Sequence, residues 1–158
     1  MSSAAVIVGL LGGILGLGAW ERTRRDAARA AVPIRIHVNG TRGKSTVTRL
    51  IAGALRESGI RTVAKTTGAA PRLILPDGRD EPIRRLAPAS IREQLWLLGR
   101  AHSLGAQALV AECMAIDPDL QEVSEREMIG ATLGVITNAR PDHGEVMGRT
   151  AEDVARAL

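Results

Sequence analysis

A short polar loop, GTRGKST (residues 40–46), constrains the fold of this chain more than any other feature. The segment IRIHV (34–38) before it reads as a strand, and apolar residues recur at helical spacing over 47–55 after it. A strand, a loop with two glycines and a helix N-terminus are the setting of a phosphate-binding loop, because glycine lets backbone N–H groups turn toward an anion. The alternative is a glycine-rich turn without a ligand.

The side chains of this loop suit particular parts of a nucleotide. Lys44 can reach terminal phosphates, and the hydroxyl of Ser45 can ligate Mg²⁺. The longer loop pattern, with a first glycine five residues before the second, fails here because that position is Val38. The flanking strand and helix nevertheless favour phosphate binding over an ordinary turn.

The remainder of the chain alternates between strand and helix patterns. Strands are predicted over 61–66, 107–112 and 132–137, and 72–85 reads as a hairpin around a turn at 76–78. Ser90 and Glu93 predict a capping box for a helix that stops at Gly105. Further helices are predicted from 117 to about 128 and from near 150. The fold class is therefore α/β, a P-loop-type parallel sheet with flanking helices and with ligands at the carboxyl ends of the strands.

Polar side chains follow three of the predicted strands. KTTGAA (65–70) offers a lysine, two hydroxyls and a glycine to oxygens or metal, although it also reads as a plain turn. Glu112 ends an apolar strand, where a carboxylate is costly unless it holds metal or forms a salt bridge. TNARPDH (137–143) brings Asn138 and His143 together with an aspartate, and His143 is a candidate metal ligand. His37, inside a strand, reads as a packing residue.

The N-terminal segment 2–20 has no charged residue and is long enough to cross a bilayer as a helix. Trp20 lies where an interfacial aromatic belongs, and four arginines follow within a basic juxtamembrane linker, 21–33. This arrangement predicts a single-pass membrane protein with its remaining residues in the cytoplasm. A cleaved signal peptide is the alternative, but the chain lacks the usual basic start. Small-residue spacings between glycines over 9–16 allow a homo-oligomer, although glycine is also common in such helices.

Composition narrows the classes of partner. Trp20 and Trp96 are the only aromatic residues, so platforms for base stacking are missing and no nucleic-acid partner is expected despite a net charge of +4. Cys113 is the single cysteine, which excludes an internal disulfide and fits a reducing compartment. It reads as a buried small residue rather than a nucleophile.

Four stretches in order, NGTRGKST, AKTTG, ECMAI and ITNARPDHGEVMG, resemble the Mur-type ATP-dependent amide ligases. Within that family the chain is most similar to the ligase subunits of poly-γ-glutamate synthases, which also begin with a membrane helix. The resemblance implies ATP and Mg²⁺, and a γ-glutamyl acyl phosphate that the amine of an incoming glutamate attacks. It also implies a polytopic membrane partner. The residues implied to bind ATP are Gly40, Thr41, Arg42, Gly43, Lys44, Ser45, Thr46 and Asn138.

The resemblance also implies catalytic roles and has limits. Lys44, Glu112 and His143 would be catalytic, with Ser45 and Glu112 sharing one metal ion and His143 holding a second. The family usually has a bulky apolar residue and an aspartate after the Asp-His pair, whereas Gly144 and Glu145 stand here. Residues 34–158 read as an incomplete ATP-binding domain that is not expected to join glutamates by itself. A generic P-loop ATPase or kinase coupled to a membrane partner, and a non-catalytic assembly subunit, are the alternatives.

Overall fold

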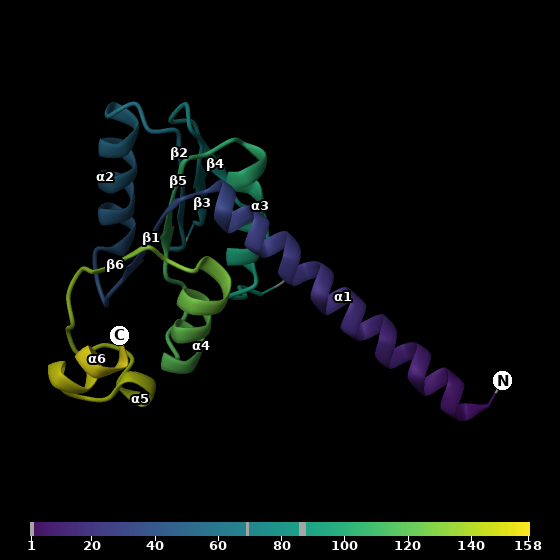
Figure 1. Ribbon diagram of the computed structural model, residues 1–158. Helices are drawn as coiled ribbons and strands as arrows, with labels where there is room; N and C mark the ends of the chain where they lie inside the picture. Colours follow the sequence, from purple (N-terminus) through teal and green to yellow (C-terminus); the bar gives the residue numbers. More distant parts are fainter. Residues whose placement is uncertain (1, 69, 86–87) are drawn as a thin grey trace.

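A six-stranded sheet in the order β4-β3-β2-β5-β1-β6 forms the centre of the domain (Figure 1). It is seen in a computed structural model that describes residues 2–68, 70–85 and 88–158. The strands β2, β5, β1 and β6 pair in parallel, and β3 and β4 add an antiparallel hairpin at one edge. The strand bounds are β1 (Ile34–Asn39), β2 (Thr62–Thr66), β3 (Arg72–Ile74), β4 (Asp80–Pro82), β5 (Ala108–Glu112) and β6 (Leu133–Ile136).

Helices cover both faces of this sheet, as the strand–helix alternation predicts. On one face, α2 (Lys44–Glu57) packs on a core that includes Val38, Ala64 and Val110. On the other face, α3 (Glu93–Ser103) and the C-terminal end of α1 (Ser3–Ala31) enclose a core that includes Leu97 and Leu109. The π-helix η1 (Val123–Ile129) packs beside α3 and continues α4 (Pro118–Glu122), and the chain closes with α5 (Gly144–Met147) and α6 (Ala151–Ala157).

Two predicted helix starts are confirmed, and one predicted cap is wrong. The hydroxyl of Thr150 accepts from the backbone N–H of Asp153 in a capping box for α6, and Asp117 caps α4. The capping box predicted from Ser90 and Glu93 is wrong, because α3 begins at Glu93 and its N-cap residue makes no side-chain cap hydrogen bond. The carboxylate of Glu93 instead forms ion pairs with two basic side chains. These charge-assisted hydrogen bonds are stronger than a capping hydrogen bond at an exposed helix end.

The N-terminal helix α1 is one continuous element that projects from the domain (Figure 1). It continues to Ala31, so most of the basic segment expected as a linker (21–33) is helical, in keeping with its many alanines and arginines. Its end is fastened to the domain by Arg35, whose guanidinium donates to the carbonyls of Arg29 (2.8 Å) and Val32 (2.7 Å). The apolar part of α1 is long enough to cross a membrane, and the domain buries none of it.

Candidate functional site

The loop after β1 depends on glycine at two positions. Gly43 has a φ of +81° and forms the N-cap of α2, so that the loop turns directly into the helix. Gly40 has a φ of +122°, and a Cβ atom there would collide with Oγ1 of Thr137 and approach the carbonyl oxygen of Asn138 to 3.0 Å. Both positions have backbone angles that other residues rarely adopt. Glycine is therefore needed for the backbone shape of the loop and, at position 40, for the close approach of the segment after β6.

The segment after β6 braces this loop. The hydroxyl of Thr41 donates to Oδ1 of Asn138 (2.6 Å), and Nδ2 of Asn138 donates to the carbonyl of Arg42 (2.8 Å). Asp142 pairs with the guanidinium of Arg42 at 3.0 Å. The observed partners of Asn138 are thus loop atoms, and its contact with a nucleotide stays a prediction.

Glu112 meets the loop from the end of β5. Its Oε2 accepts from the hydroxyl of Ser45 and from the backbone N–H of Thr67, each at 2.8 Å, and the residue is only 3% exposed. The salt bridge weighed as an alternative is not found, since no cationic side chain of the described residues pairs with this carboxylate. A buried carboxylate without a cation is costly, so Glu112 and Ser45 fit a site for a divalent ion.

A cavity of about 330 Å³ is lined by five of the ten predicted site residues, namely Gly40, Thr41, Lys44, Glu112 and His143. Lys44 lines it, with Nζ donating to the carbonyl of Gly40 at 2.5 Å, and so do Thr67 and Glu112. His143 reaches the same cavity from the loop before α5, where it has a φ of +50° and lies 3.6 Å from Glu145. Within residues 2–68, 70–85 and 88–158, no three His, Cys, Asp or Glu side chains gather as a metal cluster. The metal role of His143 therefore stays a prediction.

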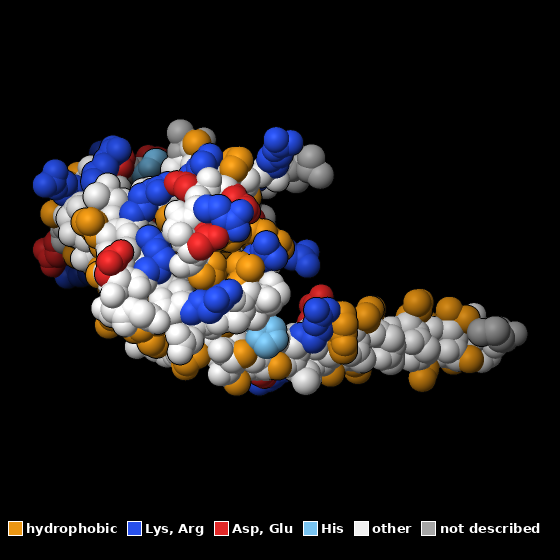
Figure 2. Space-filling model, turned by 90° about the horizontal axis from the view of Figure 1, so that it is seen from above, with side chains coloured by type: hydrophobic (Ala, Val, Ile, Leu, Met, Phe, Trp, Pro, Cys, Tyr) orange, Lys and Arg blue, Asp and Glu red, His pale blue; other side chains and the backbone are white. Residues whose placement is uncertain are grey.

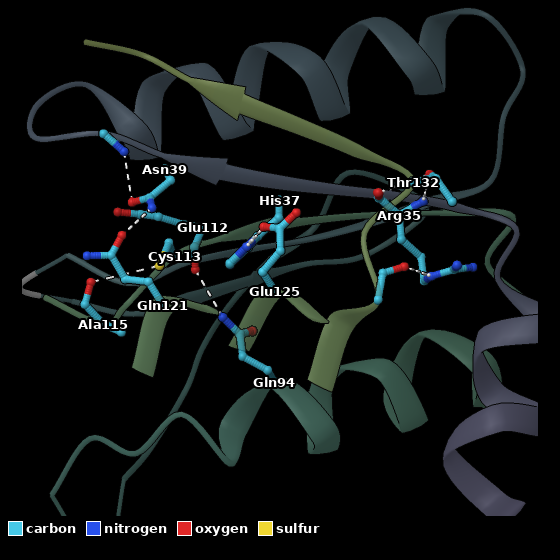
Figure 3. A network of polar contacts seen from close by, with 12 residues as sticks. Arg35, His37, Asn39, Gln94, Glu112, Cys113, Ala115, Gln121, Glu125 and Thr132 are labelled. Atoms are coloured by element: carbon cyan, nitrogen blue, oxygen red, sulfur yellow. Dashed lines mark hydrogen bonds and ion pairs between the residues drawn. The ribbon is translucent and has the colours of Figure 1, made fainter. Parts of the chain in front are cut away.

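Sequence reasoning missed a network of polar side chains in and beside this cavity (Figure 3). Asn39 donates to Oε1 of Gln121 at 2.5 Å, while its Oδ1 accepts from the backbone N–H of Gly40. Gln94, on α3, donates to the carbonyl of Glu112 at 3.2 Å. Asn39 could have been found because it directly precedes the loop. Nothing in the sequence pairs it with a glutamine 82 residues later in the chain.

Two strand residues point away from the cavity. Lys65, expected to be available to oxygens or metal, is fully buried and pairs with Glu93 at 3.0 Å. Burial lowers its pKa, and Glu93 only partly offsets this effect. Side chains alternate along a strand, so Lys65 shares the α3 face with Val63. The prediction for Lys65 was wrong for that reason.

His37 is buried on the same face and pairs with Glu125 at 2.6 Å (Figure 3). Burial lowers the pKa of His37, but hydrogen bonding to Cys113 and Glu125 raises it to about 9. Cys113 itself is buried, as expected for a small packing residue. His37 and Glu125 are not among the residues that line the cavity, whereas Cys113 is both buried and part of its lining.

Comparison with known proteins agrees with this geometry. Residues 38–158 match the Mur ligase middle domain. The chain belongs to the Mur ligase family. Its Mur-type loop, carboxylate and histidine all lie within the matched residues. No solved structure gave a significant match to the chain.

Two curated relatives place the chain more closely within the Mur ligase family. It is 44% identical over 147 residues to the PGA synthase CapB of Bacillus subtilis (strain 168), a match that covers 92% of this chain and 37% of the relative. It is 44% identical over 143 residues to the capsule biosynthesis protein CapB of Bacillus anthracis, covering 89% of this chain and 31% of that protein. The chain thus spans about a third of the length of these relatives.

Proposed function

We propose that this chain forms the ATP-binding part of a membrane-anchored amide ligase that acts in poly-γ-glutamate synthesis. The proposal is carried by the contact of Ser45 with the buried carboxylate of Glu112 beside the phosphate loop, since no cationic side chain among the described residues pairs with that carboxylate. Membership of the Mur ligase family and the similarity to a PGA synthase support it. In the reaction, a γ-carboxylate takes the terminal phosphoryl group of ATP and releases ADP. The amine of a glutamate then displaces phosphate and forms the amide bond.

Each residue of the cavity has a distinct part in this proposal. Backbone N–H groups of the loop 40–46 would bind the phosphates, and Lys44 would neutralise charge that develops on the transferred group. Ser45 and Glu112 would hold Mg²⁺, which supplies further neutralisation of phosphate charge when bound. His143, which lines the same cavity, would hold a second metal ion. Thr41 and Arg42 would contact the nucleotide, and the hydrogen bonds of Asn138 to the Thr41 hydroxyl and the Arg42 carbonyl support this role by fixing the loop.

An exchange experiment tests the proposed reaction. The matching region of the Bacillus subtilis relative would be replaced by residues 1–158, and ADP release would be followed with and without glutamate. We expect ADP release to depend on glutamate and to accompany polymer formation. ATP hydrolysis at the same rate with and without glutamate would instead indicate an ATPase. ATP binding by the hybrid, without either reaction, would favour an assembly subunit.

We further propose that α1 is an uncleaved anchor with the domain in the cytoplasm. The fastening of its C-terminal end by Arg35 supports this proposal, because a separate leader would need no such contact. The exposed apolar length of α1 and the arginines after Trp20 support the orientation. A polytopic subunit and further copies of α1 are the partners proposed within the membrane.

Labelling of introduced cysteines tests this topology. In intact cells, a membrane-impermeant thiol reagent should leave Asp77→Cys unlabelled, because the hairpin turn lies on the cytoplasmic side. Ser3→Cys, at the other end of α1, is the matched control and should react. The native thiol of Cys113 is buried and should not be labelled. Labelling of Asp77→Cys in intact cells would contradict the orientation.

A further inference from the structure

A basic groove runs along α3, outside the phosphate-loop cavity. It consists of two cavities of about 650 and 630 Å³ that share Arg92 and Trp96 in their linings. The first lies against the hairpin β3–β4 and the second against the part of α1 that begins at Trp20. In Figure 2, blue side chains border the notch between the base of α1 and the body of the domain.

The groove continues to the phosphate-loop cavity through Arg85. This arginine lines both the first cavity of the groove and the cavity that holds Lys44 and Glu112. Its guanidinium is held in place by both carboxylate oxygens of Glu93, at 2.6 and 3.1 Å. The three cavities therefore form a row from the loop 40–46 to the base of α1.

The charge of the groove is mainly positive and mainly unpaired. Among the residues that the structure describes, Arg84, Arg92 and Arg100 form no ion pair, whereas Glu93 is already paired with two cations. The half-exposed ring of Trp96 lies among these arginines as an apolar surface. Six arginines line the groove against three glutamates, the arginines being Arg24, Arg25, Arg84, Arg85, Arg92 and Arg100 and the glutamates Glu21, Glu81 and Glu93.

We propose that this groove binds the acidic polymer and leads it from the phosphate-loop cavity toward the membrane. The proposal rests on the proposed function and identifies where its polyanionic substrate lies. A γ-linked glutamate chain carries one carboxylate per residue, and these carboxylates can pair with successive guanidinium groups. Its methylene groups can pack on the ring of Trp96. Anionic lipid headgroups could bind in the cavity beside α1, but they would not explain why the row of arginines extends to Arg85, at the phosphate-loop cavity.

The test uses the full chain in nanodiscs of zwitterionic phosphatidylcholine, without nucleotide. A fluorescent γ-linked glutamate decamer is the probe, and its affinity is measured by anisotropy. Arg92→Gln with Arg100→Gln should weaken decamer binding about five- to tenfold, since two charged contacts are lost. Arg126→Gln with Arg156→Gln removes the same charge from other exposed helix faces and should change the affinity less than about twofold.

Two further measurements distinguish polymer binding from a folding defect and from lipid binding. Arg92→Lys with Arg100→Lys keeps the charge and should restore most of the affinity, which a folding defect would not allow. Equal decamer affinities in the groove variant and the control would overturn the proposal. Loss of binding to anionic vesicles alone, with decamer binding unchanged, would also overturn it and indicate a lipid site. Because the assay contains no ATP, its failure is distinct from failure of the proposed reaction.

Discussion

Replacing Lys44 with alanine should weaken ATP binding about 50-fold, equivalent to roughly 2 kcal/mol, because phosphate oxygens in the cavity lose a charged donor. Lys44 lines the cavity beside Glu112, and its ammonium group already lies against the loop carbonyl of Gly40. Calorimetry with Mg²⁺ present would measure the affinity. The thermal midpoint of the nucleotide-free protein should change little, since the side chain is only half-buried.

Arg49→Ala is the matched control for this prediction. Arg49 lies on the same helix, α2, and pairs with Asp80 of the hairpin at 2.7 Å, away from the cavity. Its removal takes one positive charge from the same element and should leave ATP affinity within about twofold. Equal ATP affinity in the wild type and Lys44→Ala would exclude the phosphate-loop interpretation.

Replacing Glu112 with glutamine should reduce the affinity for Mg²⁺-ATP by about 30-fold or more while the fold survives. The observed hydrogen bonds from Ser45 and Thr67 both reach Oε2, and the oxygen of a glutamine can accept them in the same way. The second oxygen is replaced by the amide NH₂ group, whose nitrogen does not ligate Mg²⁺, and the negative charge is lost. Calorimetry with and without Mg²⁺ would show whether Mg²⁺ still increases the affinity of the variant for ATP.

Thermal stability separates this role from a structural one. A buried carboxylate without a cation costs free energy, so the thermal midpoint of nucleotide-free Glu112→Gln should stay level or rise. Glu125→Gln is the control, because it breaks the pair with His37 outside the cavity and should lower stability without changing Mg²⁺-ATP affinity. A lowered midpoint with unchanged affinity in Glu112→Gln would reject the metal role.

The strands, the hairpin and most helix ends could be predicted from residue patterns. These depend on neighbours within a few positions, such as Thr150 with Asp153 or Asp117 with the helix it caps. The capping box at Ser90 failed although its residues are also close in sequence. Lys65 of β2 and Arg85, which lies eight residues before Glu93, both pair with the carboxylate of Glu93, so this side chain does not cap the helix. A local pattern does not reveal a stronger partner brought in by the fold.

The sequence by itself determined the phosphate loop and the apolar segment, because both follow from local chemistry: glycine backbone freedom at 40 and 43, and an uncharged length that suits a bilayer. Only the tertiary structure decided which groups meet the loop. The parallel register sets Glu112 beside Val38, and alternation along β5 turns its side chain to the α2 face, where Ser45 lies. The same alternation on β2 sends Lys65 to α3. These placements depend on strand order and register, which are set by packing between segments far apart in the chain.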